Sequence, residues 1–424
     1  MLSLCFNTRA CYLTRTAETH LLWHALGEFD AAIDRTVAAI AHAQPSPIIH
    51  ALRSLPQHLG GLGLARHQSP RTEASCLAAR TTTLQYITAH RADLLSGTQR
   101  WPNLAHVGIT TQLVYNFELY PIDADVEVAL ESSMPQDEIL RLAEDKRVFF
   151  GIMAELRAAG NRWALALLLS NAAHGTGAFL NWMGGADGRF RFRDGEFIEA
   201  LRHRLLLEPF PLPGELQCPS CPHQLICDAP WHALDCGAAK HMRIARHNIV
   251  RDHVYDMLKS VFPTASELRC ERLVGGPDDG IVFDGPRAKA DVFLRLADGQ
   301  VFVIDIVIAN PAAVRHLARH SDTTVDAAAI ESESYKRAAI ADLGLGALQF
   351  RFVPFAIETT GRLGPSARAF LDGVIGDGHR DARRLCCARI SSTIARWNAR
   401  MVLKMRAETG RGTAAGQAGL PDAG

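Results

Sequence analysis

A cluster of cysteine and histidine residues in the middle of the chain has the spacing of a zinc site. The cluster reads Cys218-x2-Cys221-x10-His232-x3-Cys236. Zinc prefers four thiolate or imidazole ligands in a tetrahedron, and a two-residue gap lets one tight turn supply two thiolates to the same ion. Because His232 and Cys236 are one helical turn apart, a short helix can present the other two ligands. We therefore predict a structural Zn²⁺ ion at this cluster.

Other residues near the cluster could replace one of these four ligands. The candidates are His223, Cys227, His241 and His247, and Cys227 is the most serious rival. The alternative interpretation is that the cysteines are small apolar core residues beside incidental histidines, since free cysteine is often buried without any ligand.

Two aspartates further along the chain have the chemistry of a magnesium site. Asp291 lies in the segment KADVFLRL and Asp305 in the segment VFVIDIVI, and both segments have the composition of β-strands. Two carboxylates that share Mg²⁺ leave positions in its octahedron for water or phosphate. Asp305 interrupts an apolar run, where a carboxylate is costly to bury without a cation or donors. The pattern favours a phosphodiesterase site, and the alternative is an Asp305 that bonds only to local donors at a strand end.

The connection between these two strands decides whether the aspartates can share an ion. Asp298-Gly299 is a strong hairpin signal. A two-residue loop at these positions would pair Asp291 with Ile306, and the two carboxylates would then face opposite sides of the sheet. A loop with an odd number of residues, or a bulge, would place Asp291 opposite Asp305 on one face. The metal-site hypothesis therefore predicts an odd connection.

A lysine usually completes such a site by positioning the attacking water and stabilising charge on the phosphate. No lysine stands two residues after Asp305, so this side chain must come from elsewhere in the chain. Lys336, on an expected helix, could reach back over the sheet, and Lys289 is the other candidate. Glu331 and Glu333 on the helix of Lys336 are expected to be salt-bridge partners rather than auxiliary metal ligands.

Basic residues on two expected helices are candidates for contacts with nucleic-acid phosphates. The formal net charge of the chain is zero, so local charge must carry this argument. Positions 380 to 411 hold nine basic and two acidic residues. A solvated helix face is the alternative explanation for such scattered charge. The candidates for phosphate contacts are Lys240, Arg243, Arg246, Arg251, Arg389, Arg396 and Arg400.

The first two hundred residues have the apolar spacing of helices. One helix is expected around FDAAIDRTVAAI, a second from a capping box at Ser133 to Gly160, and a third from Trp163. The segment LPQHLGGLGL should form a turn rather than a phosphate-binding loop, because no Lys-Ser/Thr pair follows its glycines. Near the end of the chain, an apolar stripe that includes Ile390 and Ile394 predicts a packed helix.

We predict an α+β multidomain architecture from these patterns. After a helical N-terminal domain, a small zinc knuckle precedes an α/β domain whose mixed sheet is flanked by helices. A helix at about 325–342 and a strand at LQFRFVPFAI belong to that last domain. A disordered Gly/Ala-rich tail is expected past Glu408. The expected divisions are 1–208 for the helical domain, 209–258 for the knuckle and its basic helix, 259–376 for the α/β domain, and 377–424 for the C-terminal basic helix and tail.

The cellular compartment is constrained by what the sequence lacks and by its cysteines. No run approaches the roughly 20 apolar residues that span a bilayer, and the N-terminus has no cleavage-site pattern. Ten cysteines, four of them clustered near histidines, fit reduced thiols better than a disulfide framework. We therefore expect an intracellular protein, nuclear or cytoplasmic, that is not secreted and has no membrane partner; no pattern indicates an oligomeric state.

The order of several segments is similar to that of one protein family. These segments are FDAAIDRTVAAI to LPQHLGGLGL, HGTGAFLNWM, FIEALRHRL before CPSC, HALDC followed by ARHN, the paired aspartates, and FVPFAIETTGRLGP. They resemble the C-terminal part of the open reading frame of non-LTR retrotransposons that carry a restriction-like endonuclease. The resemblance covers most of residues 10 to 375, and the combination is more specific than any single segment.

This resemblance implies a fold and a function for each part of the chain. The helical region would follow a polymerase palm as a thumb-like region, and the CCHC cluster would be a zinc knuckle that contacts nucleic acid. The last domain would resemble PD-(D/E)xK nucleases, with Asp291 and Asp305 as the acids that bind catalytic Mg²⁺ and Lys336 as a displaced lysine. In that family the nuclease nicks target DNA, and the freed 3′-hydroxyl primes reverse transcription. The implied partners are DNA and, secondarily, the element RNA.

The chain departs from the family pattern in two places. Ala290 stands where the family commonly has proline before the first aspartate. No Tyr/Phe-x-Asp-Asp stretch or other palm metal motif occurs upstream, so the resemblance implies a fragment that begins after the palm and has no polymerase site. Two hypotheses follow from the resemblance. The chain is either a Mg²⁺-dependent DNA endonuclease or a catalytically inactive nucleic-acid-binding remnant.

Overall fold

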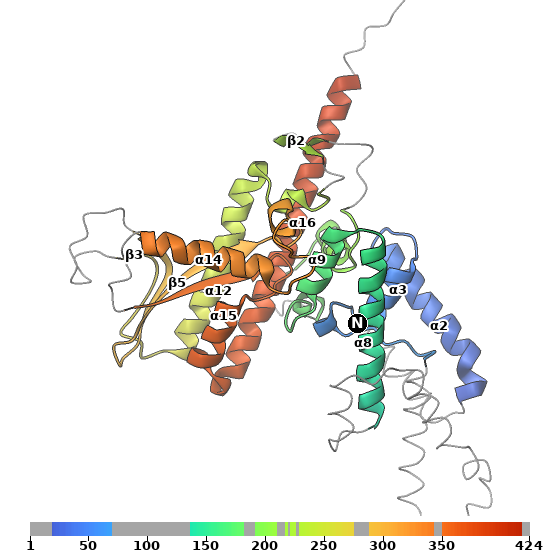
Figure 1. The fold of residues 1–424 in the computed structure, drawn as a ribbon, viewed down its shortest axis with the longest axis horizontal. Helices are drawn as coiled ribbons and strands as arrows, with labels where there is room; N and C mark the ends of the chain where they lie inside the picture. Colours follow the sequence, from blue (N-terminus) through green and yellow to red (C-terminus); the bar gives the residue numbers. More distant parts are fainter. Residues whose placement is uncertain are drawn as a thin grey trace, which may run out of the picture. The chain divides into compact units, whose positions relative to one another are not determined.

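The structure is a computed structural model that describes residues 19–69, 136–181, 191–209, 217–218, 221–225, 229–274, 288–342 and 350–417 (Figure 1). The chain divides into two compact units, residues 1–155 and residues 156–424. The described part of the chain contains helices, a four-stranded mixed sheet and a short two-stranded sheet. The predicted α+β class is therefore confirmed at this level.

The first unit contains helices where their apolar spacing predicts them. Ile33 and Val37 of the segment FDAAIDRTVAAI are buried. The capping box expected at Ser133 lies outside the described residues, but the helix it precedes is present. That helix ends just before Gly160, whose φ of 64° is in the left-handed region that favours glycine. The elements are α2 (Thr19–Ile40), α3 (Pro47–Ser54), η2 (Gln57–Leu59) and most of α8 (Gln136–Ala158).

The glycine-rich segment after α3 is a tight turn, as predicted. Gly60 has a φ of 93° and is left-handed. A Cβ atom on Gly61 would lie 2.1 Å from the carbonyl oxygen of Leu55, so the backbone packs too closely against α3 for any side chain there. The fully buried Arg53 also contacts the segment, because its guanidinium donates to the carbonyl of Ala65 at 3.2 Å. The segment therefore closes against its own unit and does not form a phosphate-binding loop.

The second unit begins with helices and leads into the cluster of Cys218, Cys221, His232 and Cys236. The cluster is followed at once by the long helix α12, of which Val250, Val254 and Leu258 are fully buried. These apolar residues belong to the core that lies against the sheet. The elements of this part are α9 (Arg162–Asn171), α10 (Ala178–Asn181), α11 (Asp194–Arg204), β1 (Gln217–Cys218), β2 (Cys221–Leu225), η6 (His232–Leu234), η7 (Gly237–Ala239) and α12 (Lys240–Val261).

A four-stranded sheet forms the centre of the second unit. Its order is β3-β4-β5-β6, in which β3 and β5 pair antiparallel to β4, and β6 runs parallel to β5. Parallel neighbours need a crossover connection, and here that connection contains α14. The elements are β3 (Glu267–Val274), β4 (Ala288–Arg295), β5 (Val301–Ala309), α13 (Val314–Leu317), α14 (Ala327–Asp342), β6 (Arg351–Glu358), α15 (Pro365–Phe370), η10 (Leu371–Ile375), η11 (Asp377–His379) and α16 (Arg380–Gln417).

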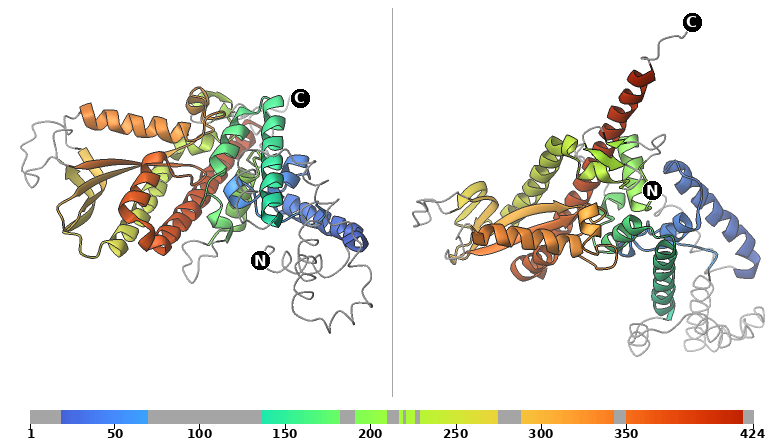
Figure 2. Two further views of the ribbon diagram at one scale, coloured as in Figure 1. Left: turned by 60° about the horizontal axis from the view of Figure 1, so that its bottom comes forward. Right: turned by 45° about the horizontal axis from the view of Figure 1, so that its top comes forward.

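Helices cover both faces of this sheet, as predicted. α12, α15 and α16 lie on one face, where Val292, Ile304 and Phe355 join the buried core. α14 lies on the other face, as the left panel of Figure 2 shows. Since side chains alternate along a strand, Asp305, which follows Ile304, points toward the side of α14. Asp291 precedes Val292 at the end of the β4–β5 ladder, where it contacts His247 of α12.

The C-terminal helix α16 is longer than expected. Its predicted apolar stripe is confirmed, since Ile390, Ile394 and Met401 are each about 1% exposed. Past Glu408 we expected disorder, but the helix continues to Gln417. A helix that is already nucleated extends at little further cost. The alanines of this segment favour the helical conformation, and they outweigh the glycines, which disfavour it. Residues 418–424 lie outside the described part of the chain.

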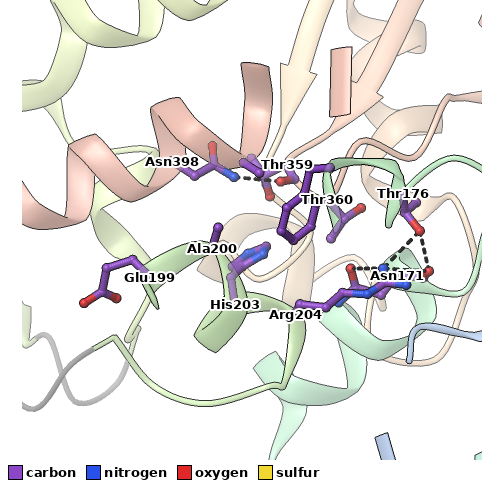
Figure 3. Close-up of a pocket in the computed structure, with 11 residues that line it drawn as sticks. Asn171, Thr176, Glu199, Ala200, His203, Arg204, Thr359, Thr360 and Asn398 are labelled. Atoms are coloured by element: carbon purple, nitrogen blue, oxygen red, sulfur yellow. Dashed lines mark hydrogen bonds between the residues drawn. The ribbon is translucent and has the colours of Figure 1, made fainter. Parts of the chain in front are cut away.

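A polar network joins α9, α11, the end of β6 and α16 within the second unit (Figure 3). Arg204 donates to the side chains of Asn171 at 2.9 Å and Thr176 at 3.0 Å, and Asn398 donates to the carbonyl of Thr359 at 2.7 Å. The cavity between them has a volume of about 10 Å³. Such a space admits about one water molecule and no larger ligand. We conclude that the network holds the helices together and is not a ligand site.

No helix among the described residues combines the length and the apolar character needed to cross a membrane.

Candidate functional site

The four predicted zinc ligands come together in the structure. Ligand atoms of Cys218, Cys221, His232 and Cys236 all lie within 4.8 Å of one another. β1 and β2 pair Cys218 with Cys221. The N–H of Cys236 donates to the carbonyl of His232 at 3.0 Å, which is the single turn that the spacing predicts. Across the described ranges, this is the one group of three or more such side chains with the geometry of a metal site.

The distances within the cluster fit a metal ion. The Sγ atom of Cys236 lies 3.4 Å from that of Cys218 and 3.9 Å from that of Cys221. Zinc–sulfur bonds of 2.3 Å in a tetrahedron separate two sulfurs by about 3.8 Å. The Nε2 atom of His232 is buried and has no hydrogen-bond partner in the described part of the chain. A buried polar atom without a partner is costly, and a cation would satisfy it. The cluster can therefore bind a metal ion such as zinc.

The rival ligands do not join this group in the described structure. The Nε2 atom of His241 lies 3.5 Å from the Nζ atom of Lys404. His247 lies in the middle of α12 and contacts Asp291 instead. Cys227 and the side chain of His223 lie outside the described residues, so the structure does not test them.

The hairpin between β4 and β5 has an odd connection, as the metal-site hypothesis predicts. The N–H of Leu296 donates to the carbonyl of Gln300 at 2.9 Å, so these two residues close the ladder. Three residues, 297–299, remain in the loop. Gly299 has a φ of 88°, the left-handed conformation that a three-residue hairpin needs at its last position.

This odd connection places the two aspartates opposite each other on neighbouring strands. Val292 pairs with Ile304 at the end of the ladder, and the next positions along the two strands are Asp291 and Asp305. The strands separate there, because the N–H of Ile306 donates to the Asp291 carboxylate at 2.7 Å rather than to a main-chain carbonyl. The two carboxyl groups are near enough for a side-chain hydrogen bond, which helps to lower the pKa of Asp291 and to raise that of Asp305.

Asp291 is held in its charged form by two donors. Burial acts to raise its pKa, but the hydrogen bond and charge of His247 and the N–H of Ile306 lower it below the usual value. The Nε2 atom of His247 lies 3.1 Å from the Asp291 Oδ2 atom. Sequence reasoning considered His247 only as a rival zinc ligand and did not connect it with Asp291. No local spacing relates these two positions, which are 44 residues apart.

Asp305 has the opposite electrostatic character. Burial raises its pKa to about 6, and the charge of Asp291 adds to this effect, although Lys336 opposes it. The Lys336 Nζ atom lies 2.9 Å from the carboxylate of Asp305. The Asp305 side chain is 18% exposed, so it remains accessible to solvent at the edge of the site. A cation bound between the two aspartates would offset the electrostatic repulsion that opposes ionisation of both carboxyl groups.

The structure distinguishes between the two candidate lysines. Lys336 reaches the acid pair from α14, whereas the Nζ atom of Lys289 forms a solvent-exposed pair with Glu271 at 2.5 Å. Glu331 accepts from His316 at 2.8 Å. Glu333 accepts from the N–H of Ser366 at 3.0 Å, at the start of α15. Both glutamates therefore act in local contacts, as expected, and not as ligands beside the acid pair.

Two of the basic candidates on α12 are engaged in contacts within the chain, Arg246 in the interior and Arg251 in exposed ion pairs. Arg246 is 2% exposed and its guanidinium donates to the Oδ1 atom of Asn398 on α16. The expected basic face is therefore wrong at Arg246, because α16 covers that position. The Arg251 guanidinium pairs with Asp252 at 2.8 Å and with Glu271 at 2.5 Å.

The remaining basic candidates differ in their exposure to solvent and in their contacts within the chain. Lys240 is exposed, and Arg243 is half-buried and donates to the carbonyl of Asp235 at 2.9 Å. On α16, Arg396 and Arg400 both pair with the buried Glu196, at 3.2 Å and 2.6 Å. These two guanidinium groups therefore anchor α16 to α11. The other α16 candidate, Arg389, is half-buried.

No protein-family model matches this chain, and no curated protein matches it. Any function must therefore be argued from the residues of the chain itself.

Proposed function

We propose that the second unit is a Mg²⁺-dependent DNA endonuclease with a PD-(D/E)xK-like fold. The proposal includes a relationship to the non-LTR retrotransposon proteins whose segments the sequence resembles, and a nick in target DNA that primes reverse transcription. One observation carries it. The three-residue hairpin places Asp291 beside Asp305, and Lys336 donates to Asp305 from the crossover helix.

Each of the three residues has a distinct role in the proposed reaction. Asp291, held charged by two donors, and Asp305, whose pKa is raised by burial to about 6, would together hold the ion. When bound, Mg²⁺ supplies activation of a water molecule and stabilisation of charge on the phosphate. Lys336 brings a positive charge to the same place, where it can donate to the attacking water or to a phosphate oxygen.

The zinc cluster supports the proposal as a structural element beside the nuclease site. η7 is the only element between Cys236 and α12, and α12 packs into the core behind the sheet. Zn²⁺ in the cluster would fix the start of this helix. Of the basic candidates, Lys240 and Arg243 at the same end of α12 are the ones we propose for contact with DNA, with the element RNA as a second ligand. The proposed site of action is the nucleus.

The test is the nicking of supercoiled plasmid DNA by the zinc-loaded full chain with and without Mg²⁺. The variants Asp291→Asn and Asp305→Asn keep the shape of each side chain and remove its charge. We expect each to lower the rate of nicking by at least about 100-fold, because two carboxylates are needed to hold the ion. Asp342→Asn, at an exposed position at the end of the same helix as Lys336, is the matched control. Nicking that is equal in all four proteins would eliminate the catalytic assignment.

One observation favours the alternative, an inactive nucleic-acid-binding remnant. Each aspartate already has a cationic or donating partner within the chain, Lys336 for Asp305 and His247 for Asp291. Such a network can be stable without a metal ion. The remnant would bind DNA in the same assay but would nick it no faster with Mg²⁺ than without.

A further inference from the structure

A cavity of about 300 Å³ lies beside the Cys/His cluster in the second unit. Residues around η6 form one wall, Arg243 of α12 lies on a second, and the loop that follows β5, from Asn310 to Arg315, forms the third. Ligand pockets in proteins have volumes of about 300 to 1,000 Å³. The cavity can therefore hold a group of about the size of one nucleotide.

Two arginines line this cavity and keep their charge available. Arg243 is half-buried, and its guanidinium donates to the carbonyl of Asp235 at 2.9 Å. This contact holds the side chain in place without neutralising its charge. Arg315 is exposed. In the part of the chain that the structure describes, neither guanidinium forms an ion pair with a carboxylate, whereas Arg396 and Arg400 both pair with Glu196.

Asp235 supplies the one carboxylate among the described residues that line the cavity, and its charge acts on the interior. Its Oδ2 atom is buried. Burial lowers the pKa of Arg246 to about 10, and the negative charge of Asp235 opposes that decrease. The carboxylate therefore compensates a buried guanidinium, and Arg243 and Arg315 leave a surplus of positive charge at the cavity.

The other walls of the cavity are fixed and partly apolar. The Oδ1 atom of Asn310 accepts from the N–H of Ala312 at 3.2 Å, and its Nδ2 atom donates to the carbonyl of Trp231 at 3.5 Å. These contacts hold the loop after β5 against the segment of the cluster. Val314 is 56% exposed and offers apolar surface to a sugar or a base. Apolar walls with a few convergent polar groups are typical of a pocket for a small ligand.

We propose that this cavity binds the phosphate monoester of a nucleotide, with Arg243 and Arg315 as the residues that bind the phosphate. A phosphate monoester carries a charge of about −1.5 to −2 at neutral pH, which two guanidinium groups match. A diester within a nucleic-acid strand carries only one negative charge. Arginine also presents paired N–H donors that suit phosphate oxygens. The inference extends the proposed nucleic-acid contact of Arg243 and does not depend on the acid pair.

The experiment compares single-stranded DNA oligonucleotides of one sequence that carry a 5′-phosphate, a 3′-phosphate or no terminal phosphate. Each has an internal fluorophore, and binding to the zinc-loaded full chain is measured by anisotropy without Mg²⁺. We expect the wild type to bind at least one phosphorylated form about tenfold or more tightly than the unphosphorylated form, since hydrogen bonds to charged groups are strong. Equal binding of all three would overturn the proposal.

Two variants and a control assign the preference to the cavity. Arg315→Met and Arg243→Met should each reduce the preference for the terminal phosphate to less than about threefold. Arg315 is exposed, so its replacement tests the site even if Arg243→Met fails to fold. Arg319→Met is the matched control, because Arg319 is exposed and lies near Glu331 instead. A preference that survives in Arg315→Met, or that is lost equally in Arg319→Met, would contradict the assignment.

Competition distinguishes the two sources of such a phosphate. The competitors are a deoxynucleoside monophosphate with the preferred phosphate position, the unlabelled phosphorylated oligonucleotide, and inorganic phosphate. Displacement by the mononucleotide at concentrations similar to those of the oligonucleotide identifies a free nucleotide as the ligand, and much weaker displacement identifies a strand end. Inorganic phosphate as effective as the nucleotide would overturn the assignment to a nucleotide. No step involves cleavage, so a failure here leaves the endonuclease proposal unaffected.

Discussion

Lys336 donates to Asp305 across the crossover connection that joins β5 to β6. The Nζ atom lies 2.9 Å from the carboxylate, although the two residues are 31 positions apart in the chain. The contact exists because α14 covers the face of the sheet toward which Asp305 points (Figure 2). Lys336 on α14 therefore supplies the lysine that is absent from the position two residues after Asp305 on β5.

Replacement of this lysine should reduce nicking and spare the fold. We expect Lys336→Met to lower the nicking rate by about 100 to 1,000-fold, since a positioned donor at a developing charge contributes about that much. Lys289→Met is the matched control, because Lys289 forms a solvent-exposed pair with Glu271. Rates are measured at saturating Mg²⁺. Equal rates in the two variants would assign the lysine role to neither residue.

The conformation of Gly299 should contribute measurably to stability. A Cβ atom added there meets nothing within 4 Å, so a substitution changes only the cost of its left-handed backbone. We expect Gly299→Ala to lower the free energy of unfolding by about 1 kcal/mol. Gly299→Asn should cost less, because asparagine tolerates this conformation better. Urea unfolding measures both values, and an alanine variant as stable as the wild type would contradict the three-residue loop.

Removal of zinc should unfold the region around the cluster. We expect one Zn²⁺ per chain in the purified protein and none in Cys236→Ser, because a tetrahedral structural site rarely survives the loss of a thiolate. Metal content is measured by mass spectrometry and stability by thermal circular dichroism. Cys387→Ser, at a half-buried cysteine on α16, is the control and should keep its zinc. A variant of Cys236 that retains one equivalent would point to a different ligand, with Cys227 as the first candidate.

Asp326 should make stability depend on pH in the acid range. Burial acts against it, but hydrogen bonds from Arg368 and Arg362 lower the pKa of Asp326 below its usual value. A carboxylate with a lowered pKa stabilises the fold above its unfolded pKa of about 3.9, and this contribution is lost as the pH falls through the lower folded value. The stability difference between wild type and Asp326→Asn should therefore be largest near neutral pH.

Breaking the partly buried ion pair of Asp326 with Arg362 and Arg368 should lower the free energy of unfolding by about 3 kcal/mol at neutral pH. The difference between wild type and variant should shrink below about pH 4. Asparagine is a suitable replacement because Asp326 has a φ of 64°, which Asn tolerates. Unfolding in urea at several pH values provides the measurement. A difference in stability that stays constant down to acid pH would show that the charge of Asp326 does not stabilise the fold.

The basic residues of α12 should separate into two groups in DNA binding. Lys240→Ala and Arg243→Ala should each weaken binding to any DNA sequence and reduce the salt dependence of the binding constant by about one phosphate contact. Arg246→Met should instead lower stability, because it leaves Asn398 without its buried donor. Fluorescence anisotropy over a range of salt concentrations makes the distinction. A salt dependence altered by Arg246→Met alone would contradict it.

Local patterns predicted several elements of the fold and all four residues of the Cys/His cluster. The alternation in VFVIDIVI and the turn residues Asp298-Gly299 were sufficient to identify the hairpin. They were not sufficient to fix its loop length, because the same two residues suit two- and three-residue connections. In the folded chain, the left-handed conformation of Gly299 identifies the three-residue connection.

Long-range contacts were beyond the reach of sequence reasoning. The burial of Arg246 depends on Asn398, which is 152 positions away, and the role of His247 depends on the exact rotation of α12 against the sheet. Neither of these two contacts produces a periodic pattern in the sequence. Lys336 could be proposed because only two lysines lay near enough in the expected topology, and the packing of α14 then distinguished between them.

α12 starts four residues after the last cysteine of the cluster and carries His247 about 10 Å further along its axis. The part of α12 between these two points is only about two turns long and is rigid, so a tilt at the thiolates would be transmitted to the imidazole. The occupancy of the Cys/His cluster would thereby affect the contact between His247 and Asp291, and a chelator that removes an ion from the cluster would disturb this contact without reaching it.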